Sequence, residues 1–334
     1  MPGTGFATVG GGIAMDVHGK NHHGAGSFGQ HIIEFTLMTP KGPKTVSPKD
    51  EALFKATIGG LGQTGPILSA RFRMLKAKGD VMVVTERRVD DWDEFLGLLD
   101  ASDATYTVGW IDATARGEAL GRGILEEAET GGGLVRPAKR GKSVPFNAPG
   151  FALSPAIVRM FNAAYWRRVP ERGRTVVKPI DDFFFPLDKI SDWNRLYGKA
   201  GFHQFQCVVP VDAADALRTM MEKIANSGLA SPLAVLKRMG PGRGGYLSFP
   251  MEGYTLAVDF RNSPKAERLV ATLEDMTVAA GGRIYFAKDA LMRADNVAKM
   301  YPEHGDWLDA VTAADPNRAY ETDLTRRLKL RDAS

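Results

Sequence analysis

The sequence of 334 residues contains one cysteine, Cys207, and no long apolar run. A single cysteine excludes an intrachain disulfide, and no segment approaches the roughly 20 apolar residues of a membrane-spanning helix. The first residues, MPGTGFATVGGG, have neither the basic start nor the apolar core of a secretory signal peptide. We therefore expect a protein of a reducing compartment, with a cytoplasmic location.

The net charge is also small: 43 Lys and Arg residues and 39 Asp and Glu residues give a formal net charge of +4. No nucleic-acid-binding motif accompanies it, so we expect no nucleic acid partner. The positive charge gathers in two clusters: Arg136, Lys139, Arg140 and Lys142, then Arg167, Arg168, Arg172, Arg174 and Lys178. Solvated loops explain such clusters as well as an anionic partner does, whether a membrane surface or a phosphate-bearing substrate.

Residue patterns predict mainly short strands and glycine turns in residues 1–78, and alternating strands and helices beyond them. In the first part we expect a β-hairpin over 31–48, a helix over 50–60 that ends at Gly59–Gly60, and a strand over 66–75. Further strands are predicted over 81–88, 104–112, 202–210, 232–240, 253–260 and 283–287, and helices over 90–102, 212–228 and 263–282. A long mobile loop is expected over 126–150, an irregular region over 151–200 and a helical tail from Asp289. The alternation favours a sheet covered by helices on one face.

The stretch from Thr8 to His31, TVGGGIAMDVHGKNHHGAGSFGQH, combines seven glycines with four of the six histidines. His18, His22 and His23 could ligate a metal, but carboxylates and cysteines are too few for a typical zinc site. Gly24–Gly29 lacks the strand and helix that frame a dinucleotide fingerprint. Glycines that let backbone N–H groups approach a pyrophosphate or a flat ring fit a cofactor site better. A glycine-rich turn with surface histidines is the bland alternative.

The same stretch, with FKATIGGLGQTGPIL downstream, resembles the second half of the FAD domain of vanillyl-alcohol-oxidase-type flavoproteins. More segments resemble the decaprenylphosphoryl-β-D-ribose 2-oxidase family: YTVGWIDA, FPLDKISDWNRLYG, GFHQFQ, LAVLKRMG, YTLAVDF, RIYFAKDA, MYPEHGDWL and DPNRAYETDLTRRL. The resemblance runs in order over nearly the whole chain. It implies an α+β fold, in which a PCMH-type FAD-binding domain (second half) carries an inserted α+β cap domain built on an antiparallel sheet. The implied boundaries are 1–78 for the FAD domain, 79–283 for the cap and 284–334 for a segment that returns to the FAD domain.

The resemblance implies an FAD-dependent oxidoreductase that oxidises the C2 hydroxyl of a polyprenylphosphoryl-β-D-ribose, a lipid-linked sugar phosphate, to a ketone. A short-chain NAD(P)H reductase would then complete the epimerisation to an arabinose donor for the cell wall. The basic, aromatic stretch 136–178 would allow peripheral contact with the inner membrane, although a surface loop explains it equally well. One alternative is an alditol or aldonolactone oxidase that uses oxygen, and another is a truncated, flavin-free, inactive fragment.

The residues that the family uses at its site map onto this chain. The resemblance implies non-covalent FAD, lined by Gly3, Thr8, Val9, Gly10, Gly11, Met15, Asp16, Val17, His18, Ile67 and Tyr285. It implies a substrate site made of Lys20, Trp110, Arg195, Gln204, Gln206, Lys237, Thr255 and Lys288, with Lys288 and His18 as catalytic residues and no metal. A lysine desolvated beside a flavin could act as a base, whereas a solvated lysine at a strand end is the alternative. Gln204 and Gln206 alternate along a strand, so we expect both on one face, either a cavity wall or a solvent-facing surface.

The chain also departs from the family pattern. Ala257 replaces a cysteine, and Met239 and Thr255 replace an aromatic residue and an amide of the family's pocket. Family members carry a further N-terminal segment with the first glycine-rich loop of the FAD domain. We therefore expect this chain to supply half of a cofactor domain and, alone, to bind FAD poorly unless a separate chain completes it.

Overall fold

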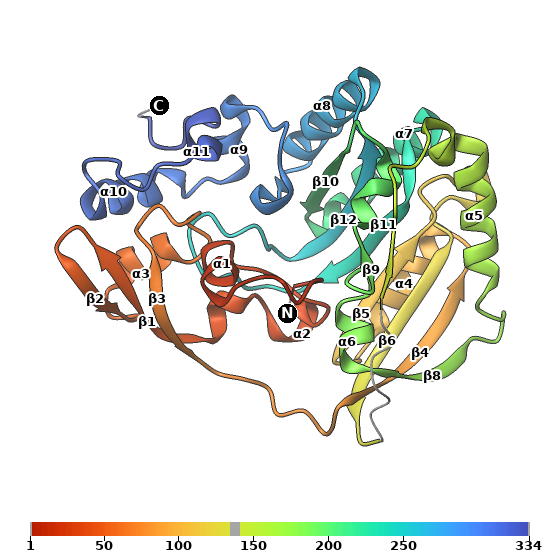
Figure 1. Cartoon of the computed structure of the whole chain (residues 1–334), viewed down its shortest axis with the longest axis horizontal. Coiled ribbons are helices and arrows are strands. Elements are labelled where there is room, and N and C mark those ends of the chain that lie inside the picture. The colour runs from red at the N-terminus through yellow and green to blue at the C-terminus, as the bar shows by residue number, and fades with distance from the viewer. Residues whose placement is uncertain (1, 134–140, 333–334) are drawn as a thin grey trace.

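The structure, a computed structural model, describes residues 2–133 and 141–332 and contains a small and a large antiparallel sheet (Figure 1). The first part of the chain forms α1 (Val9–Ala14), α2 (His22–Ala25), β1 (Ile32–Thr39), β2 (Gly42–Val46), α3 (Glu51–Thr57) and β3 (Ile67–Phe72). The small sheet has the order β2-β1-β3, and its hairpin turns at Gly42, whose φ of 106° suits glycine. The predicted hairpin, helix and strand in this part are confirmed.

The expectation of only strands and glycine turns is wrong for the segment TVGGGIA, because its residues Val9–Ala14 form helix α1. The Thr8 hydroxyl caps this helix by accepting the Gly11 N–H at 3.0 Å. Ile13 lies fully buried in a core that it shares with Phe35 and Leu37 of β1. The cap and this buried contact together outweigh the low helix propensity of three consecutive glycines.

The large sheet has eight strands in the order β13-β10-β12-β11-β5-β6-β4-β8. Its strands are β4 (Val81–Val89), β5 (Tyr106–Ile111), β6 (Gly123–Gly131), β8 (Arg174–Pro179), β10 (Phe202–Val209), β11 (Ala230–Met239), β12 (Gly253–Arg261) and β13 (Arg283–Ile284). Helices α4 (Trp92–Ala101), α7 (Ala214–Ser227) and α8 (Pro264–Ala279) bury their apolar sides against one face in the main core. The predicted helix cover on one face is confirmed, and the opposite face is left to line a cavity.

Several elements were not predicted from the sequence. The expected loop over 126–150 begins with β6, a strand with partners on both sides, and the expected irregular region holds β8, α5 (Pro155–Arg167) and α6 (Ile180–Phe184). Strand β6 reads GILEEAETG, and its glutamates pair with neighbouring strands or loops instead of alternating with apolar residues. The predicted strand over 283–287 is shortened to β13, after which a 3₁₀ turn begins at Phe286. Part of the expected loop, 134–140 with Arg136, Lys139 and Arg140, lies outside the described residues, whereas 141–150 holds the two-residue strand β7 (Lys142–Ser143).

An extended segment over 73–80 leads from β3 to β4 (Figure 1). The C-terminal helices α9 (Val297–Met300), α10 (His304–Ala314) and α11 (Asp323–Arg327) return to the first part of the chain. There the Gln63 side chain donates to the Tyr320 carbonyl at 2.8 Å, and the Tyr320 hydroxyl donates to the Met38 carbonyl at 3.2 Å. The division into domains at residues 78 and 283 stays a prediction. Within the described parts, none of the helices has the length and apolar character needed to cross a membrane.

Candidate active site

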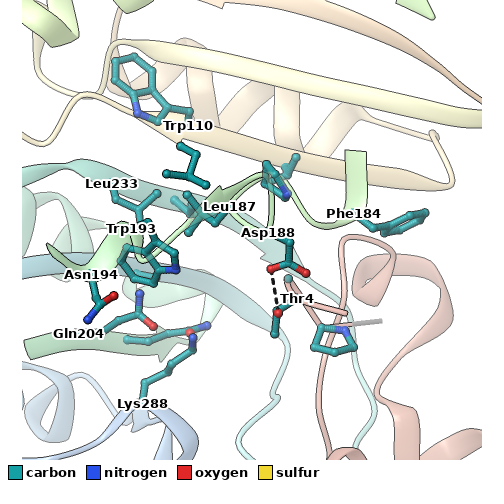
Figure 2. Close-up of a pocket in the computed structure, with 18 of the residues that line it drawn as sticks. Thr4, Trp110, Phe184, Leu187, Asp188, Trp193, Asn194, Gln204, Leu233 and Lys288 are labelled. Carbon is teal, nitrogen blue, oxygen red and sulfur yellow. Dashed lines mark hydrogen bonds between the residues drawn. The ribbon is translucent and has the colours of Figure 1, made fainter. Parts of the chain in front are cut away.

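A cavity of about 1860 Å³ lies against the face of the large sheet that α4, α7 and α8 leave free. Its wall combines residues from the N-terminal segment, β5, β6, β10, β11, β12, α5 and the turn after β13. All three of Gln204, Lys288 and Trp110 line the cavity, and in the view of Figure 2 Trp110 lies at the top while Gln204 and Lys288 lie toward the bottom. Typical single-ligand pockets occupy about 300–1,000 Å³, so the volume accommodates more than one small molecule.

Most of the residues predicted to hold a cofactor line this cavity: Gly3, Thr8, Gly11, Met15, Val17, His18 and Tyr285. Four others do not line it: Val9, Gly10, Asp16 and Ile67. Asp16 is fully buried, and its carboxylate accepts the backbone N–H groups of Gly29 at 2.7 Å and Gly244 at 2.8 Å. Its side chain therefore holds two loops together and faces away from the cavity.

The predicted substrate residues are brought together with one exception. Lys20, Trp110, Gln204, Gln206, Lys237, Thr255 and Lys288 all line the cavity, and so does Ala257. Arg195 does not, because its guanidinium donates to the Val144 carbonyl at 3.0 Å and to that of Pro145 at 3.3 Å. Met239 is fully buried behind the wall. The two glutamines face the same side of β10, and that side is a cavity wall rather than a solvent-facing surface.

Hydrogen bonds engage both ring nitrogens of His18. The Gln206 amide lies 3.0 Å from Nε2 of His18 and 3.2 Å from the Thr255 hydroxyl, which donates to the Cys207 carbonyl at 2.8 Å. On the other side of the ring, Nδ1 lies 3.2 Å from Nζ of Lys237. The donor in this contact depends on the tautomer of the imidazole and on the protonation of the lysine. His18 is therefore held between β10 and β11 by polar contacts at both nitrogens.

Burial and neighbouring positive charges lower the pKa values of both groups. Desolvation and the positive charge of Lys237 hold the pKa of His18 well below 6.5. Desolvation, together with Lys20 and Lys288, lowers the pKa of Lys237 from 10.5 to about 7. His18 therefore favours its neutral form, and Lys237 exchanges its proton near neutral pH, at the point where Tyr285 also approaches, with its ring centroid 5.5 Å from that of His18.

Two more lysines supply positive charge to the same cavity. Desolvation lowers the pKa of Lys20 to about 8, and the ammonium group lies 3.8 Å from the centre of the Phe183 ring. Desolvation also lowers the pKa of Lys288, an effect that the nearby Asp259 carboxylate opposes. Lys288 and His18 thus share one site, although they are far apart in the sequence.

Sequence analysis missed the polar support behind this site. Asp259 is fully buried on β12, where it accepts the Gln204 amide at 2.5 Å and the Tyr197 hydroxyl at 2.9 Å. Desolvation raises its pKa to about 6. A carboxylate inside the otherwise apolar strand sequence YTLAVDF was the available signal, since buried carboxylates need partners.

The metal hypothesis for the histidines finds no support in the geometry. His18 and His22 meet edge to face with their ring centroids 6.4 Å apart, and His23 Nε2 contacts the Ala104 carbonyl at 2.8 Å. Across 2–133 and 141–332, no three His, Cys, Asp or Glu side chains come together as a set of metal ligands. The three imidazoles therefore lie in three different environments.

Comparisons with known proteins give two extended similarities, whereas no family model matches the chain. The chain is 35% identical over 346 residues to a decaprenylphosphoryl-β-D-ribose oxidase of Mycolicibacterium smegmatis, with 99% of this chain and 75% of that protein covered. It is 31% identical over 352 residues to an uncharacterised protein in the mprA 5′ region of Streptomyces coelicolor, with 98% and 95% covered. Both similarities extend over nearly the whole chain and so include both sheets and the cavity.

Proposed function

The chain belongs to the decaprenylphosphoryl-β-D-ribose oxidase family, an oxidoreductase family, and from this premise we propose that it is an FAD-dependent enzyme acting on a secondary alcohol of a sugar. The proposed reaction converts the C2 hydroxyl of a polyprenylphosphoryl-β-D-ribose to the 2-keto form. The observation that carries the proposal is the convergence of His18, Lys237 and Lys288 on one large cavity. These three groups come from distant parts of the sequence.

The cavity wall fits a flavin nucleotide. Gly11 and Gly12 form part of the wall and carry no side chain, so backbone groups are open to a ligand. Met15, Val17 and the Tyr285 ring add apolar surface suited to a flat ring, and lysines beside it favour negative charge on that ring. FAD, when bound, supplies the acceptor for the hydride that leaves the alcohol carbon.

The remaining chemistry falls to the protein. Oxidation of an alcohol also releases the hydroxyl proton, which needs a nearby base. Lys288 and His18 are the proposed catalytic residues, because both face the cavity and burial lowers the pKa of each, which favours the neutral form that can accept a proton. Lys20 stays mostly protonated below its pKa of about 8 and is suited to pair with the phosphate of the substrate.

The product also defines a partner. A 2-keto sugar becomes the epimeric alcohol when hydride is returned to the opposite face, so we propose a short-chain NAD(P)H reductase as the consuming enzyme. A lipid-linked substrate further fits peripheral contact with a membrane surface. Arg167 and Arg172 near α5 and β8 support such contact through attraction to anionic lipids, whereas Arg168, Arg174 and Lys178 of the same cluster are paired with Glu86.

The test is a flavin measurement on the purified chain. FAD is added, unbound cofactor is removed, and an absorption scan reports binding; anaerobic addition of farnesylphosphoryl-β-D-ribofuranose should then bleach the bound flavin. Lys288→Ala should keep the flavin and slow bleaching by roughly 100-fold or more, as expected for loss of an acid–base group. Acid precipitation should release the flavin intact.

Other results would redirect the assignment. Bleaching by an alditol or aldonolactone, with peroxide released in air and no need for a lipid phosphate, would favour the soluble sugar oxidase alternative. A chain that binds no FAD would support the inactive-fragment alternative. Unchanged bleaching in Lys288→Ala would remove this lysine from the mechanism.

A further inference from the structure

Beyond the lysines, the cavity continues as an arm with a largely apolar wall. The wall residues of this arm come from β5, β6, β11, α5 and the loops beside them: Val108, Trp110, Ile124, Leu153, Ile157, Phe161, Phe184, Leu187, Leu233 and Val235. In Figure 2, Leu187 and Leu233 lie between Trp110 and the pair formed by Gln204 and Lys288. The proposed reaction centre and the apolar arm are therefore parts of one cavity.

Strand order gives the length of this arm. Gln206, Thr255 and Lys237 lie on the neighbouring strands β10, β12 and β11, and the apolar wall continues across β5 to β6. Adjacent strands are about 4.8 Å apart, so the arm extends about 10 Å beyond Lys237. A single pentose at the lysines would leave this space unfilled.

The arm opens to solvent beside α5. Three wall residues are also substantially exposed, Phe161 at 49%, Leu196 at 44% and Ile157 at 36%, and they mark the mouth. Apolar surface thus extends from the interior to the exterior, and a chain too long for the cavity can leave through this opening. A closed pocket for a small ligand would not need such a mouth.

Charged residues at the edge of the arm do not call for an anionic ligand. Lys178 donates to Glu126 at 2.8 Å and to the fully buried Glu86 at 2.9 Å, and Arg168 donates to Glu86 at 3.2 Å. These charges are therefore already paired within the protein. The lysines facing the reaction centre remain better placed for a phosphate.

We propose that the arm binds the first isoprenoid units of a polyprenyl phosphate, with the phosphate toward Lys20 and the rest of the tail leaving between Ile157, Phe161 and Leu196. This inference rests on the proposed function, because it names where the lipid of that substrate lies. A single chain enters the arm, which distinguishes this site from docking of the outer surface of α5 on a bilayer.

The test uses binding alone and needs neither FAD nor turnover. Trp110 and Trp193 both line the cavity, so tryptophan fluorescence of the purified chain reports its occupancy. The probes are farnesyl phosphate, geranyl phosphate, isopentenyl phosphate and inorganic phosphate. Because each buried methylene adds favourable transfer free energy, we expect affinity to rise roughly 10-fold or more from isopentenyl to farnesyl phosphate.

Variants on α5 locate the tail. Phe161→Asp and Ile157→Asp should weaken farnesyl phosphate binding about 10-fold and leave inorganic phosphate binding unchanged. Met160→Asp is the matched control, because Met160 is 70% exposed on the same helix and does not line the cavity. If one variant fails to fold, the other and the chain-length series on the unmodified protein still decide the matter.

Three results would overturn the proposal. One is equal affinity for farnesyl and isopentenyl phosphate, and another is equal weakening by Met160→Asp and Phe161→Asp, which would place the lipid on the outer surface of α5. The third is a combined result: Phe161→Asp and Ile157→Asp still bind anionic vesicles as the unmodified chain does, and the unmodified chain binds farnesyl phosphate no more tightly than inorganic phosphate. Chain-length dependence without flavin bleaching would contradict the proposed function alone.

Discussion

Burial of the Lys237 amine beside two other lysines costs stability. Its pKa of about 7 in the folded protein lies below the ordinary 10.5, so the unfolded chain binds more protons between these pH values. The resulting penalty is complete below pH 7 and disappears as the pH rises toward 10.5. We expect Lys237→Met to raise the free energy of unfolding at pH 7 by about 1–2 kcal/mol, after the lost hydrogen bond to His18 is deducted. Urea titrations from pH 6 to pH 10 measure the difference.

A matched control is Lys223→Met on α7, where the lysine is exposed and no pH-dependent difference is expected. A gain in Lys237→Met that does not decline with pH, or a loss of stability at pH 7, would contradict the lowered pKa of Lys237. The same variant should weaken the proposed function, since functional sites commonly sacrifice stability for chemistry.

At the scale of elements, α4 packs on the large sheet by placing one aromatic ring over two glycines. Phe95 is fully buried over Gly109 of β5 and Gly123 of β6, and a Cβ at either glycine would overlap its ring. Gly109→Ala should therefore destabilise the protein by about 1–3 kcal/mol, because the ring or the strand must shift. Thermal unfolding followed by circular dichroism measures the loss.

Gly97 on the same helix provides the opposite case. A Cβ at Gly97 would meet no atom within 4 Å, so Gly97→Ala should stabilise by about 0.5–1 kcal/mol through helix propensity alone. Two Gly→Ala changes in one helix–sheet unit thus have opposite expected signs. Equal effects would mean that packing of Phe95 does not determine the role of Gly109.

Elements with a regular pattern of buried apolar residues were easier to predict from the sequence than elements without one. Helices α7 and α8 have one buried side and clear ends, and their sequences predicted them well. Strand β6 instead places Glu126, Glu127 and Glu129 in ion pairs or hydrogen bonds with neighbours distant in sequence, so its pattern resembles a loop. Helix α5 buries only Val158 and Asn162, but its apolar residues recur at helical spacing, so the sequence carried a signal for this helix that the expectation of an irregular region missed.

At the scale of the whole molecule, the candidate site depends on contacts that local sequence cannot specify. The resemblance identified His18, Gln206 and Lys237 as site residues, but the hydrogen-bonded order Thr255, Gln206, His18, Lys237 is seen only in the folded structure. Arg195 is the opposite case. The resemblance predicts that it binds substrate, but in this structure its guanidinium donates to backbone carbonyls of residues 144–145. Spacing along the chain could not distinguish these two outcomes.

The two parts of the molecule are joined beside this site by the buried Asp16. Its two oxygens accept N–H groups from Gly29 of the first part and from Gly244 in the loop between β11 and β12. Asp16→Asn places an NH₂ group against one of the two N–H donors, and that buried donor then lacks an acceptor. We expect a loss of about 2–4 kcal/mol in unfolding free energy, since hydrogen bonds to a charged acceptor are strong.

Asp306→Asn on α10 is the control for this change, because Asp306 is exposed and should alter stability by less than about 0.5 kcal/mol. Since His18 lies two residues beyond Asp16, the Asp16 variant should also loosen the imidazole, which hydrogen exchange of the 10–30 segment would detect as faster exchange. Unchanged exchange together with wild-type stability would show that the loops are held by their other contacts and that Asp16 does not couple the small sheet to the cavity.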